Sequence, residues 1–579
     1  MTAPDAKAGV FDSGATVSLG AGNPFTNEGV LSPGALLNVF TTNETGNFVQ
    51  TMTGSCGSFG APTTACGYLA TDLQFSNQTS DRLNVTGTAA VSGAVVVSIL
   101  NAGMALPGAH DVTLVSAVGG AAMPGLALQS QPTAVATYML AQPNPNDVNL
   151  HYVIDFSPAG LTQNQHAVGN AINAIQTARI PTFAPIAAAI FYQPNVAALG
   201  QVYDSISGEG VAEAEQTAFA MNDRFQSAVM REMDFWLFDD ENDDPNAKVL
   251  GTSALSYVDD ADIGSPAFAN VKTPMAWPQP RTWRAWAVMY GGTSNNPANP
   301  YVGSAATTES DGGAAFGLDY QIDPHAIVGV AGGYNRANFG VLDRATGGTV
   351  EGGQIALYGS VRGENAYLAG LLGGDFNGNN ERRFASIPGT VLPPLFGTFA
   401  SAIGGFAENP AGAFASNAFS GQFETGYRNH LGAGVDLTPF AGMQFAVLRM
   451  DGFTETNGGL PSTIGLNYMG RTIASVPSFL GVQLSRKIDL GGDMKLSFWA
   501  RAAWKHEFEP LRSIEAGFIA APGFNFIVNG ASAISDMARV DAGMKVAVSK
   551  NLEFFASFDG DFAPQGRDIA GSGGVRVNW

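Results

Sequence analysis

The stretch RVDAGMKVAVS, residues 539–549, alternates between apolar and polar or small side chains along its whole length. The even-numbered residues from Val540 to Val548 are apolar, whereas Arg539, Asp541 and Lys545 lie on the other face. A period of two is the period of a β-strand. Residues 354–361 and 495–508 alternate in the same way. From Thr282 onward, the sequence therefore predicts a sheet of amphipathic strands.

Connection lengths favour a membrane barrel over a soluble sheet. We place about twelve strands, an even number as in bacterial barrels. They begin near Trp283, Ala314, Ala326, Gly353, Ala366, Phe419, Pro439, Phe479, Lys495, Arg539, Leu552 and Gly571. Long connections at 293–311, 339–349, 385–414, 451–476 and 509–537 alternate with tight ones at 323–325, 362–365, 429–434, 489–493 and 549–551. Long outer loops and short periplasmic turns are typical of outer-membrane barrels.

The last strand reads GGVRVNW, residues 573–579. Val575, Val577 and Trp579 share one face, and Arg576 and Asn578 share the other. A terminal aromatic residue on the apolar face places its ring in the interfacial girdle at the barrel seam. We therefore interpret Val575, Val577 and Trp579 as a C-terminal assembly signal.

Composition agrees with this fold. The 579 residues include 72 glycines, and only 13% are charged. No stretch reaches the 18 or more apolar residues that a membrane helix needs, so a membrane-spanning form must be a closed barrel. The net charge of −21 argues against binding nucleic acid through the overall field. The start MTAPDAKAGVFDSG lacks the pattern of a signal peptide, and we expect one upstream or a differently assigned start.

Residues 1–160 predict many short strands separated by turn signals. Segments 27–40 and 81–100 look like rungs of a right-handed parallel β-helix, which buries its interior by stacking coils. Cys56 and Cys66 enclose the short loop CGSFGAPTTAC. We expect one local disulfide in an oxidising compartment, with two unpaired thiols as the alternative, and no metal site, because no histidine lies nearby.

Residues 161–281 predict a helical connector followed by an acidic linker. Ala167, Ala171 and Ile175 recur at helical spacing, and the segment 211–236 predicts the longest helix. Its apolar residues at helical spacing are Val211, Ala218, Phe225, Val229 and Met233. This helix either packs on its neighbours or threads a barrel pore. The run FDDENDDPN in the linker, residues 238–281, predicts a solvated loop rather than a calcium loop, since it lacks the EF-hand glycine and glutamate.

Residues 282–579 resemble the translocator domain of monomeric autotransporters, the type V secretion class. The resemblance is carried by TWRAWAVMYGG (282–292), AAFGLDYQIDPHAIVGVAGGY (314–334), GGQIALYGSVRGENAYLAGLLGG (352–374) and VRVNW (575–579). Upstream, segment 76–93 resembles the end of β-helical passengers, and segments 161–172 and 207–229 resemble the helices that precede the translocator. The segments keep the family's order, and together they cover most of the chain.

The resemblance implies a twelve-stranded barrel in outer-membrane lipid, with a helix in its pore and the passenger on the cell surface. It also implies a monomer assembled by the barrel-assembly machinery and periplasmic chaperones. Residues expected to line the lumen are Asp319, Gln354, Arg501, Arg539, Asp541, Lys545 and Arg576. Some members cut their passenger at an Asn-Asn bond. Here the pairs at 295–296 and 379–380 fall at loop-like positions outside the helical region, so this cleavage is not predicted.

Signatures of catalysis are weak. VFDSGAT, residues 10–16, resembles the Asp-Ser-Gly loop of aspartic proteases, but it occurs once, and a turn between solenoid strands is the favoured interpretation. The sequence holds no G-x-S-x-G, H-E-x-x-H or Walker A string. The 6 histidines are dispersed, and His325 and His430 fall in predicted turns. We therefore expect no catalytic, cofactor or metal residues.

The leading hypothesis is an autotransporter with a β-helical stem (1–160), a connector and linker (161–281) and a barrel (282–579), whose passenger serves adhesion or surface display. One alternative places the catalytic part of an enzymatic passenger upstream of Met1. Another is a plugged pore with a periplasmic N-terminal domain.

Overall fold

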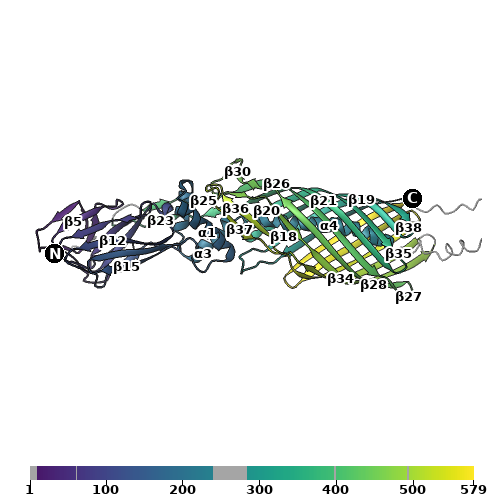
Figure 1. Ribbon diagram of the computed structural model, residues 1–579, viewed down its shortest axis with the longest axis horizontal. Coiled ribbons are helices and arrows are strands. Elements are labelled where there is room, and N and C mark those ends of the chain that lie inside the picture. The colour runs from purple at the N-terminus through teal and green to yellow at the C-terminus, as the bar shows by residue number, and fades with distance from the viewer. Residues whose placement is uncertain (1–8, 60, 239–282, 397–399, 492–493) are drawn as a thin grey trace, which may run out of the picture.

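The computed structural model describes residues 9–59, 61–238, 283–396, 400–491 and 494–579. Figure 1 shows an elongated molecule with a solenoid at one end, helices in the middle and a barrel at the other end. The N-terminus lies at the free end of the solenoid, and the C-terminus lies at the free end of the barrel. The predicted acidic linker lies outside the described residues apart from Phe238.

The solenoid is a stack of short strands. They are β1 (Val10–Ser13), β2 (Thr16–Ser18), β3 (Pro24–Asn27), β4 (Val30–Pro33), β5 (Thr41–Thr45), β6 (Asn47–Gln50), β7 (Tyr68–Gln74), β8 (Thr79–Ser80), β9 (Arg82–Val85), β10 (Ala89–Val91), β11 (Ala94–Leu100), β12 (Gly108–Ala117), β13 (Ala121–Ala122) and β14 (Ala127–Ser130). Successive coils add one strand to each of three parallel sheets, in the orders β1-β4-β7-β11-β14, β2-β5-β9-β12 and β3-β6-β10-β13. Leu31, Leu69 and Val95 stack in the interior. The N-terminal region is thus a parallel β-helix fragment.

The solenoid ends in an antiparallel hairpin. Strands β15 (Ala136–Asn144) and β16 (Asp147–Ile154) pair with each other, and β16 pairs with β12. This differs from the purely parallel coils that the sequence predicts. The reason is local: the segment around Asn144 and Asp147 makes a tight turn, and the side chains of these two residues are hydrogen-bonded at 2.7 Å.

Four helices follow the hairpin: α1 (Gln163–Ala178), α2 (Ala184–Phe191), α3 (Val196–Ile206) and α4 (Glu213–Leu237). Short 3-10 turns occur at η1 (Ala102–Met104), η2 (Pro181–Phe183), η3 (Glu209–Ala212) and η6 (Leu342–Arg344). A capping box between Thr162 and Gln165 starts α1, because each side chain accepts a hydrogen bond from the other's backbone N–H. Asn195 caps α3 in the same sense.

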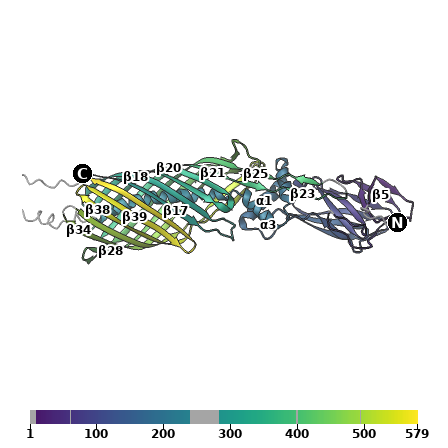
Figure 2. The same ribbon diagram turned by 180° about the vertical axis from the view of Figure 1, so that it is seen from behind.

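Twelve antiparallel strands form the closed barrel. They are β17 (Trp283–Asn296), β18 (Thr307–Asp323), β19 (Ala326–Val341), β20 (Thr346–Arg362), β21 (Ala366–Arg383), β26 (Pro410–Tyr427), β28 (Val435–Met450), β34 (Pro477–Gly491), β35 (Met494–Glu507), β38 (Asp536–Ser549), β39 (Leu552–Ala563) and β40 (Gly566–Asn578). Pairing of β40 with β17 closes the sheet, as Figure 2 shows from behind, and the backbones of Trp283 and Trp579 exchange hydrogen bonds at this seam. Closure leaves no free edge in lipid.

The connections at the end of the barrel near the stem carry short strands of their own. These are β22 (Ala385–Ile387), β23 (Thr390–Leu392), β24 (Ser401–Ile403), β25 (Phe406–Glu408), β29 (Phe453–Thr454), β30 (Thr456–Asn457), β31 (Leu460–Pro461), β32 (Leu466–Tyr468), β33 (Arg471–Ser475), β36 (Ser513–Phe518) and β37 (Asn525–Asn529), while β27 (Asn429–Gly432) lies at the opposite end. Two separate connections together build the four-stranded sheet β29-β32-β36-β37. This sheet, the loop sheet below, lies beside the helices.

One predicted loop is wrong. Residues 339–349 were expected to form a long connection, but β19 and β20 stay paired as far as Val341 and Thr346, and only the turn at η6 joins them. A strand needs roughly 9–11 residues to cross a bilayer, and β19 has 16. The pairing therefore continues beyond the membrane, where the polar, glycine-rich sequence no longer distinguishes strand from loop.

Candidate functional site

Helix α4 occupies the barrel lumen. Figure 1 shows it inside the barrel, and nearly all of its 25 residues are buried. At about 1.5 Å per residue it reaches roughly 37 Å, enough to cross the hydrocarbon core of about 30 Å. Val211, expected in this helix, belongs instead to η3, and α4 begins at Glu213.

The two ends of α4 are held by opposite ends of the barrel. At its start, Glu209 accepts hydrogen bonds from the Arg344 side chain and from the backbone of Ala305. At its end, Arg362 donates to the carbonyls of Trp236 and Leu237 at 3.1 and 3.3 Å. A guanidinium at the C-terminus of a helix satisfies carbonyls that have no partner within the helix, and it complements the helix dipole.

All seven residues predicted to line the lumen face the interior. Asp319, Gln354, Lys545 and Arg576 are buried, Arg501 and Arg539 are largely enclosed, and Asp541 lines a cavity beside Arg231. Five of the seven contact α4 directly: Gln354, Arg501, Arg539 and Arg576 through hydrogen bonds, and Lys545 through its ammonium, which lies 5.5 Å from the centroid of the Phe235 ring. Lys545 also pairs with Glu553 of the wall. Asp319 pairs with Arg284 of the wall, and no hydrogen bond of Asp541 is found among the described residues.

Three arginines bridge the helix to the wall. Arg501 donates to Asp234 of α4 at 2.7 Å and to Glu424 of β26 at 2.6 Å. Arg539 joins Asp223 of α4 to Asp561 of β39 at 2.7 Å on each side. Arg576 joins Glu232 to Glu553 at 2.6 and 3.0 Å. Each guanidinium is thus shared between a helix carboxylate and a wall carboxylate, which fixes the rotation of α4 about its axis.

The charged face of α4 is the part that sequence reasoning missed. The apolar stripe predicts the helix, yet the same segment also carries Asp223, Arg224, Arg231, Glu232 and Asp234. A helix that is charged on several sides needs either bulk water or a polar enclosure, and only the second agrees with a pore. These charges were the feature of the sequence that could have placed the helix inside the barrel.

Uncharged polar groups add to the contact. The Asn222 side chain donates to Asp375 and, at 2.8 Å, to Ser420. Asn335 donates to the carbonyl of Met221 at 2.9 Å, and Gln444 donates to Gln226 at 3.0 Å. Asn335, Asp375, Ser420 and Gln444 are buried on the inward face of β19, β21, β26 and β28, where polar side chains are expected in a barrel.

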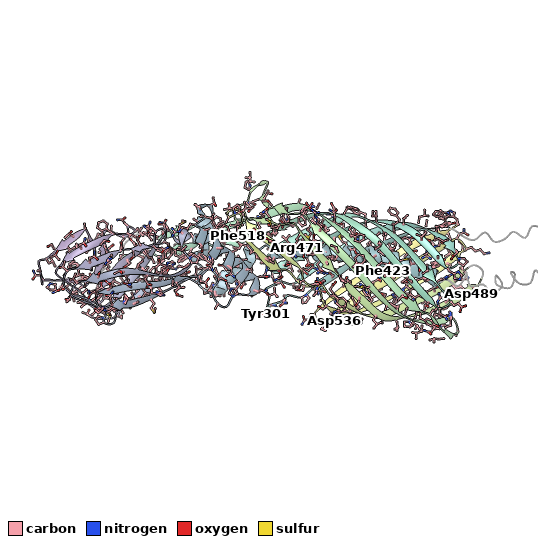
Figure 3. All side chains as sticks on the ribbon, viewed as in Figure 1. Tyr301, Phe423, Arg471, Asp489, Phe518 and Asp536 are labelled. Atoms are coloured by element: carbon pink, nitrogen blue, oxygen red, sulfur yellow. A yellow bond between two sulfur atoms is a disulfide. The ribbon has the colours of Figure 1, made fainter. Side chains whose placement is uncertain are left out.

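The outward face of the barrel is apolar. Val328, Val330 and Tyr334 alternate with buried residues along β19 and are about half exposed. Phe423 in Figure 3 is another ring on this surface. At the seam, Val577 and Trp579 face outward, while Arg576 and Asn578 are buried. Val575 is intermediate in exposure.

The helices of the connector sit on the loop sheet. Phe518 lies at the junction between stem and barrel in Figure 3, and its ring is 5.1 Å from that of Phe183. Asn164 of α1 exchanges two hydrogen bonds with the backbone of Asn529 in β37. A second contact reaches the solenoid itself. The ring of Phe396, in the long connection after β21, lies 5.6 Å from the ring of Tyr68.

Cys56 and Cys66 form a disulfide, and Tyr68 packs beside it. The two asparagines at 379–380 lie within strand β21 and not in a loop, because both residues pair with β20 on one side and with β26 on the other. The pair at 295–296 ends β17.

Groups with catalytic character are dispersed in the structure as well. Asp12 is exposed on β1, and a turn separates β1 from β2. His325 and His430 are exposed at the free end of the barrel. Within the described ranges, no three His, Cys, Asp or Glu residues are grouped to hold a metal ion. Of the helices that the structure describes, none is long and apolar enough to cross a membrane.

Comparison with known proteins identifies the barrel. Residues 285–559 match the family model described as autotransporter beta-domain. Solved structures similar to this chain include the translocator domain of the autotransporter NalP from Neisseria meningitidis, at 14% identity and TM-score 0.39, covering 52% of this chain and 90% of that one. The β-domain of the Bordetella autotransporter BrkA shows 17% identity and TM-score 0.35, covering 52% and 100%. The transport unit of AIDA-I from Escherichia coli shows 14% identity and TM-score 0.35, covering 58% and 99%.

No curated protein sequence matches the chain. The family match and the closed twelve-stranded sheet with an apolar outer face locate the barrel in the outer membrane. The chain ends of such barrels face the periplasm, so the stem at the opposite end lies at the cell surface. By this match, residues 285–559 of the barrel are an autotransporter beta-domain.

Proposed function

We propose that this protein delivers its own N-terminal stem to the cell surface and keeps it there as a non-catalytic passenger for adhesion or display. The observation that carries the proposal is the path of α4. It connects the stem at one end of the barrel with the periplasmic end, where Arg362 binds its last carbonyls. A chain that has passed through the barrel from inside to outside would leave this arrangement behind.

Docking of the stem supports retention. The connector helices rest on the loop sheet through Asn164–Asn529 and Phe183–Phe518, and the solenoid is contacted by Phe396 on its disulfide-bearing face. These contacts come from strands and loops on the outer side of the barrel. These contacts form only after transport, and they would hold back a passenger that is released. They therefore support a passenger that stays attached to the barrel.

The contact between Ser157 and His166 lacks the arrangement of a hydrolytic site, which supports a non-catalytic passenger. Ser157 Oγ lies 2.7 Å from His166 Nδ1 at the start of α1. Among the described residues, no carboxylate is hydrogen-bonded to the His166 ring, so a third group that would orient it is missing from this part of the chain. The pair serves to hold the turn before α1, where the backbone N–H of Ser157 also donates a hydrogen bond to Asp155 Oδ1 at 2.7 Å.

The assembly partners follow from the resemblance. We propose that periplasmic chaperones and the barrel-assembly machinery insert the barrel as a monomer, with Val575, Val577 and Trp579 as the terminal signal. The apolar, alternating last strand and its pairing with β17 support this role. The surface ligand is proposed only as a class, a partner that binds the long repetitive faces of a solenoid.

Surface exposure tests the proposal directly. An epitope is inserted at the exposed β15–β16 turn near Pro145, and a control epitope at the Pro324 turn, on cells expressing the chain with a signal peptide. Protease added to intact cells should remove the first epitope and leave the second, together with a heat-modifiable barrel fragment. Protection of the first epitope until the membrane is broken would support a periplasmic domain instead.

Adhesion requires a second readout. Cells displaying the intact stem are compared with the same cells after surface proteolysis, for attachment to immobilised extracellular-matrix and glycan-coated surfaces. Loss of attachment on proteolysis supports the adhesive role. Equal attachment before and after proteolysis contradicts it and leaves display alone.

A further inference from the structure

The outer surface of the barrel changes character along four neighbouring strands, β18, β19, β20 and β21 (Figure 1). Toward the periplasmic end, their outward side chains are apolar and exposed, namely Phe316, Leu318, Val328, Val330, Ile355, Leu357, Leu368 and Leu372. Two exposed rings end this band toward the stem. Tyr334 and Phe376 lie in one row across the sheet, because both pair in register with Gly353. Aromatic rings in this position mark the boundary between hydrocarbon and lipid head groups.

The rows just beyond these rings, toward the stem, are polar. Arg336 and Glu351 pair in register in the first row, and the next row holds two asparagines and a threonine. Arg382 follows one row further along β21. The two arginines and the two asparagines are exposed, so their side chains point away from the lumen. The residues called the outer arginine site below are Arg336, Asn338, Thr349, Asn380 and Arg382.

The two arginines of this site are close enough to act on one group. Arg336 pairs with Glu351 of β20 and Arg382 pairs with Gly347 of the same strand, so they are two strands and four residue steps apart. Their backbones are therefore separated by roughly 16 Å. Two extended arginine side chains can bridge this distance through a group that binds between them. The row of asparagines lies between the two arginines.

Both guanidiniums are available to an outside partner. No hydrogen bond or ion pair of the Arg382 side chain is found among the described residues. Arg336 lies 3.4 Å from Glu351, in a pair whose side chains are 59% and 39% exposed, and such exposed pairs are weak. Glu351 is the one outward carboxylate in these rows, while Asp343 lies beyond them in the turn at η6. Within the site, two positive charges thus face one negative charge.

We propose that the outer arginine site binds the phosphate group of a lipid in the outer leaflet, whose acyl chains lie on the apolar band. Guanidinium groups bind phosphate oxygens in a bidentate manner, and the amides of Asn338 and Asn380 supply further N–H donors. The site lies at the end of the barrel near the stem, which is the outer side of the membrane. Its position directly beyond the lipid-facing band favours a membrane lipid over a soluble partner. The site does not depend on what the stem does at the surface.

Lipid titration of the full-length protein in detergent micelles, followed by native mass spectrometry, tests the site. The probe is bisphosphorylated lipid A. Arg336→Ala/Arg382→Ala should raise the apparent Kd about thirtyfold, since each arginine beside an anionic lipid contributes roughly fivefold. Lipid A from which the phosphates have been removed should bind the wild type and this variant equally weakly. Displacement of the lipid by an equal concentration of inorganic phosphate would point to a free anion and would overturn the proposal.

The matched control is Arg449, an exposed outward arginine on β28 near the same end of the barrel. Its register partners on the neighbouring strands are Asn417 and Thr472, so no second arginine lies beside it. Arg449→Ala should leave the apparent Kd unchanged. A loss equal to that of the double variant would mean that any surface arginine suffices, and it would contradict a defined site. Heat-modifiable migration on gels shows that each variant is folded before titration.

A variant that strengthens binding provides an independent test. Glu351→Gln removes the carboxylate that repels a phosphate and competes for Arg336, so the apparent Kd for lipid A should fall. Such a gain cannot result from a misfolded barrel. Unchanged or weaker binding in Glu351→Gln would contradict the site. Equal affinity of the wild type and Arg336→Ala/Arg382→Ala would refute it.

Discussion

The ion pair between Arg383 and Glu455 ties the barrel to the loop sheet that carries the stem. Arg383 ends β21 and donates to both oxygens of Glu455 at 2.7 and 2.8 Å, and its side chain is only 1% exposed. It also donates to the carbonyl of Ser205 in α3 at 3.0 Å. Glu455 in turn accepts from the backbone of Leu466 at 2.6 Å and from Tyr468 at 3.2 Å.

Replacing Arg383 with Met leaves the Glu455 carboxylate buried without its counter-charge. Loss of one partner of a buried pair costs about 3–5 kcal/mol. The double variant Arg383→Met/Glu455→Gln removes the charge but keeps an acceptor for Leu466 and Tyr468, so we expect it to recover about half of that loss. The exposed pair Arg336–Glu351 is the control, because Arg336→Met should cost less than about 1 kcal/mol.

The assay is pulse proteolysis of the full-length protein in membranes across a urea series. The stem and the loop sheet are cleaved once they unfold, whereas the barrel stays protected, and the midpoints convert to free energies of unfolding through the urea dependence. A midpoint for Arg383→Met within about 1 kcal/mol of the wild type, with no gain in the double variant, would refute the role of this pair in holding the stem.

Three further outcomes are expected. Glu44 is buried in the solenoid, and burial raises its pKa from 4.5 to about 7. The fold therefore favours the neutral carboxyl. The contribution of this residue to the stability of the stem is fully present below a pH of about 4.5 and is lost as the pH rises through about 7. Glu44→Gln should therefore flatten the pH dependence of the pulse-proteolysis midpoint, by at most about 3 kcal/mol between pH 5 and pH 8. Cys56→Ser/Cys66→Ser should destabilise the stem by about 2–3 kcal/mol in the same assay, and an equal effect of reductant on the wild type would agree. Trp579→Ala should lower the yield of heat-modifiable barrel severalfold because it removes a lipid-facing ring at the seam, whereas Trp579→Phe should retain it.

The sequence predicts the barrel well because the alternation within each strand shows which of its faces is turned toward lipid. A lipid-facing strand must alternate residue by residue, as 539–549 does, and this requirement is local. The order of strands also follows, since neighbours in the chain pair with each other around the barrel. Long connections after β21 and β28 and the closing aromatic residue were visible for the same reason.

Local patterns do not predict the contents of the lumen. Arg501 and Asp234 are 267 positions apart, and Arg576 and Glu232 are 344 apart. Neither segment by itself predicts these ion pairs, because a charged side chain that faces the lumen can be hydrated as well as paired with an opposite charge. Helix α4 was recognised as a helix, but its place in the pore and its off-centre position depend on glycines and alanines of one wall facing arginines of the other.

The loops show the same division. Residues 453–468 and 513–529 are polar and irregular in sequence, and they become one sheet only by pairing Leu466 with Phe518 across the top of the barrel. The sequence by itself thus determined the strands, the helix and the closing seam, whose forces act within a few residues or against lipid. The tertiary structure decided which charges pair, where the helix lies and how the stem is seated, because burial of a charge is stabilising only when a distant residue supplies its partner.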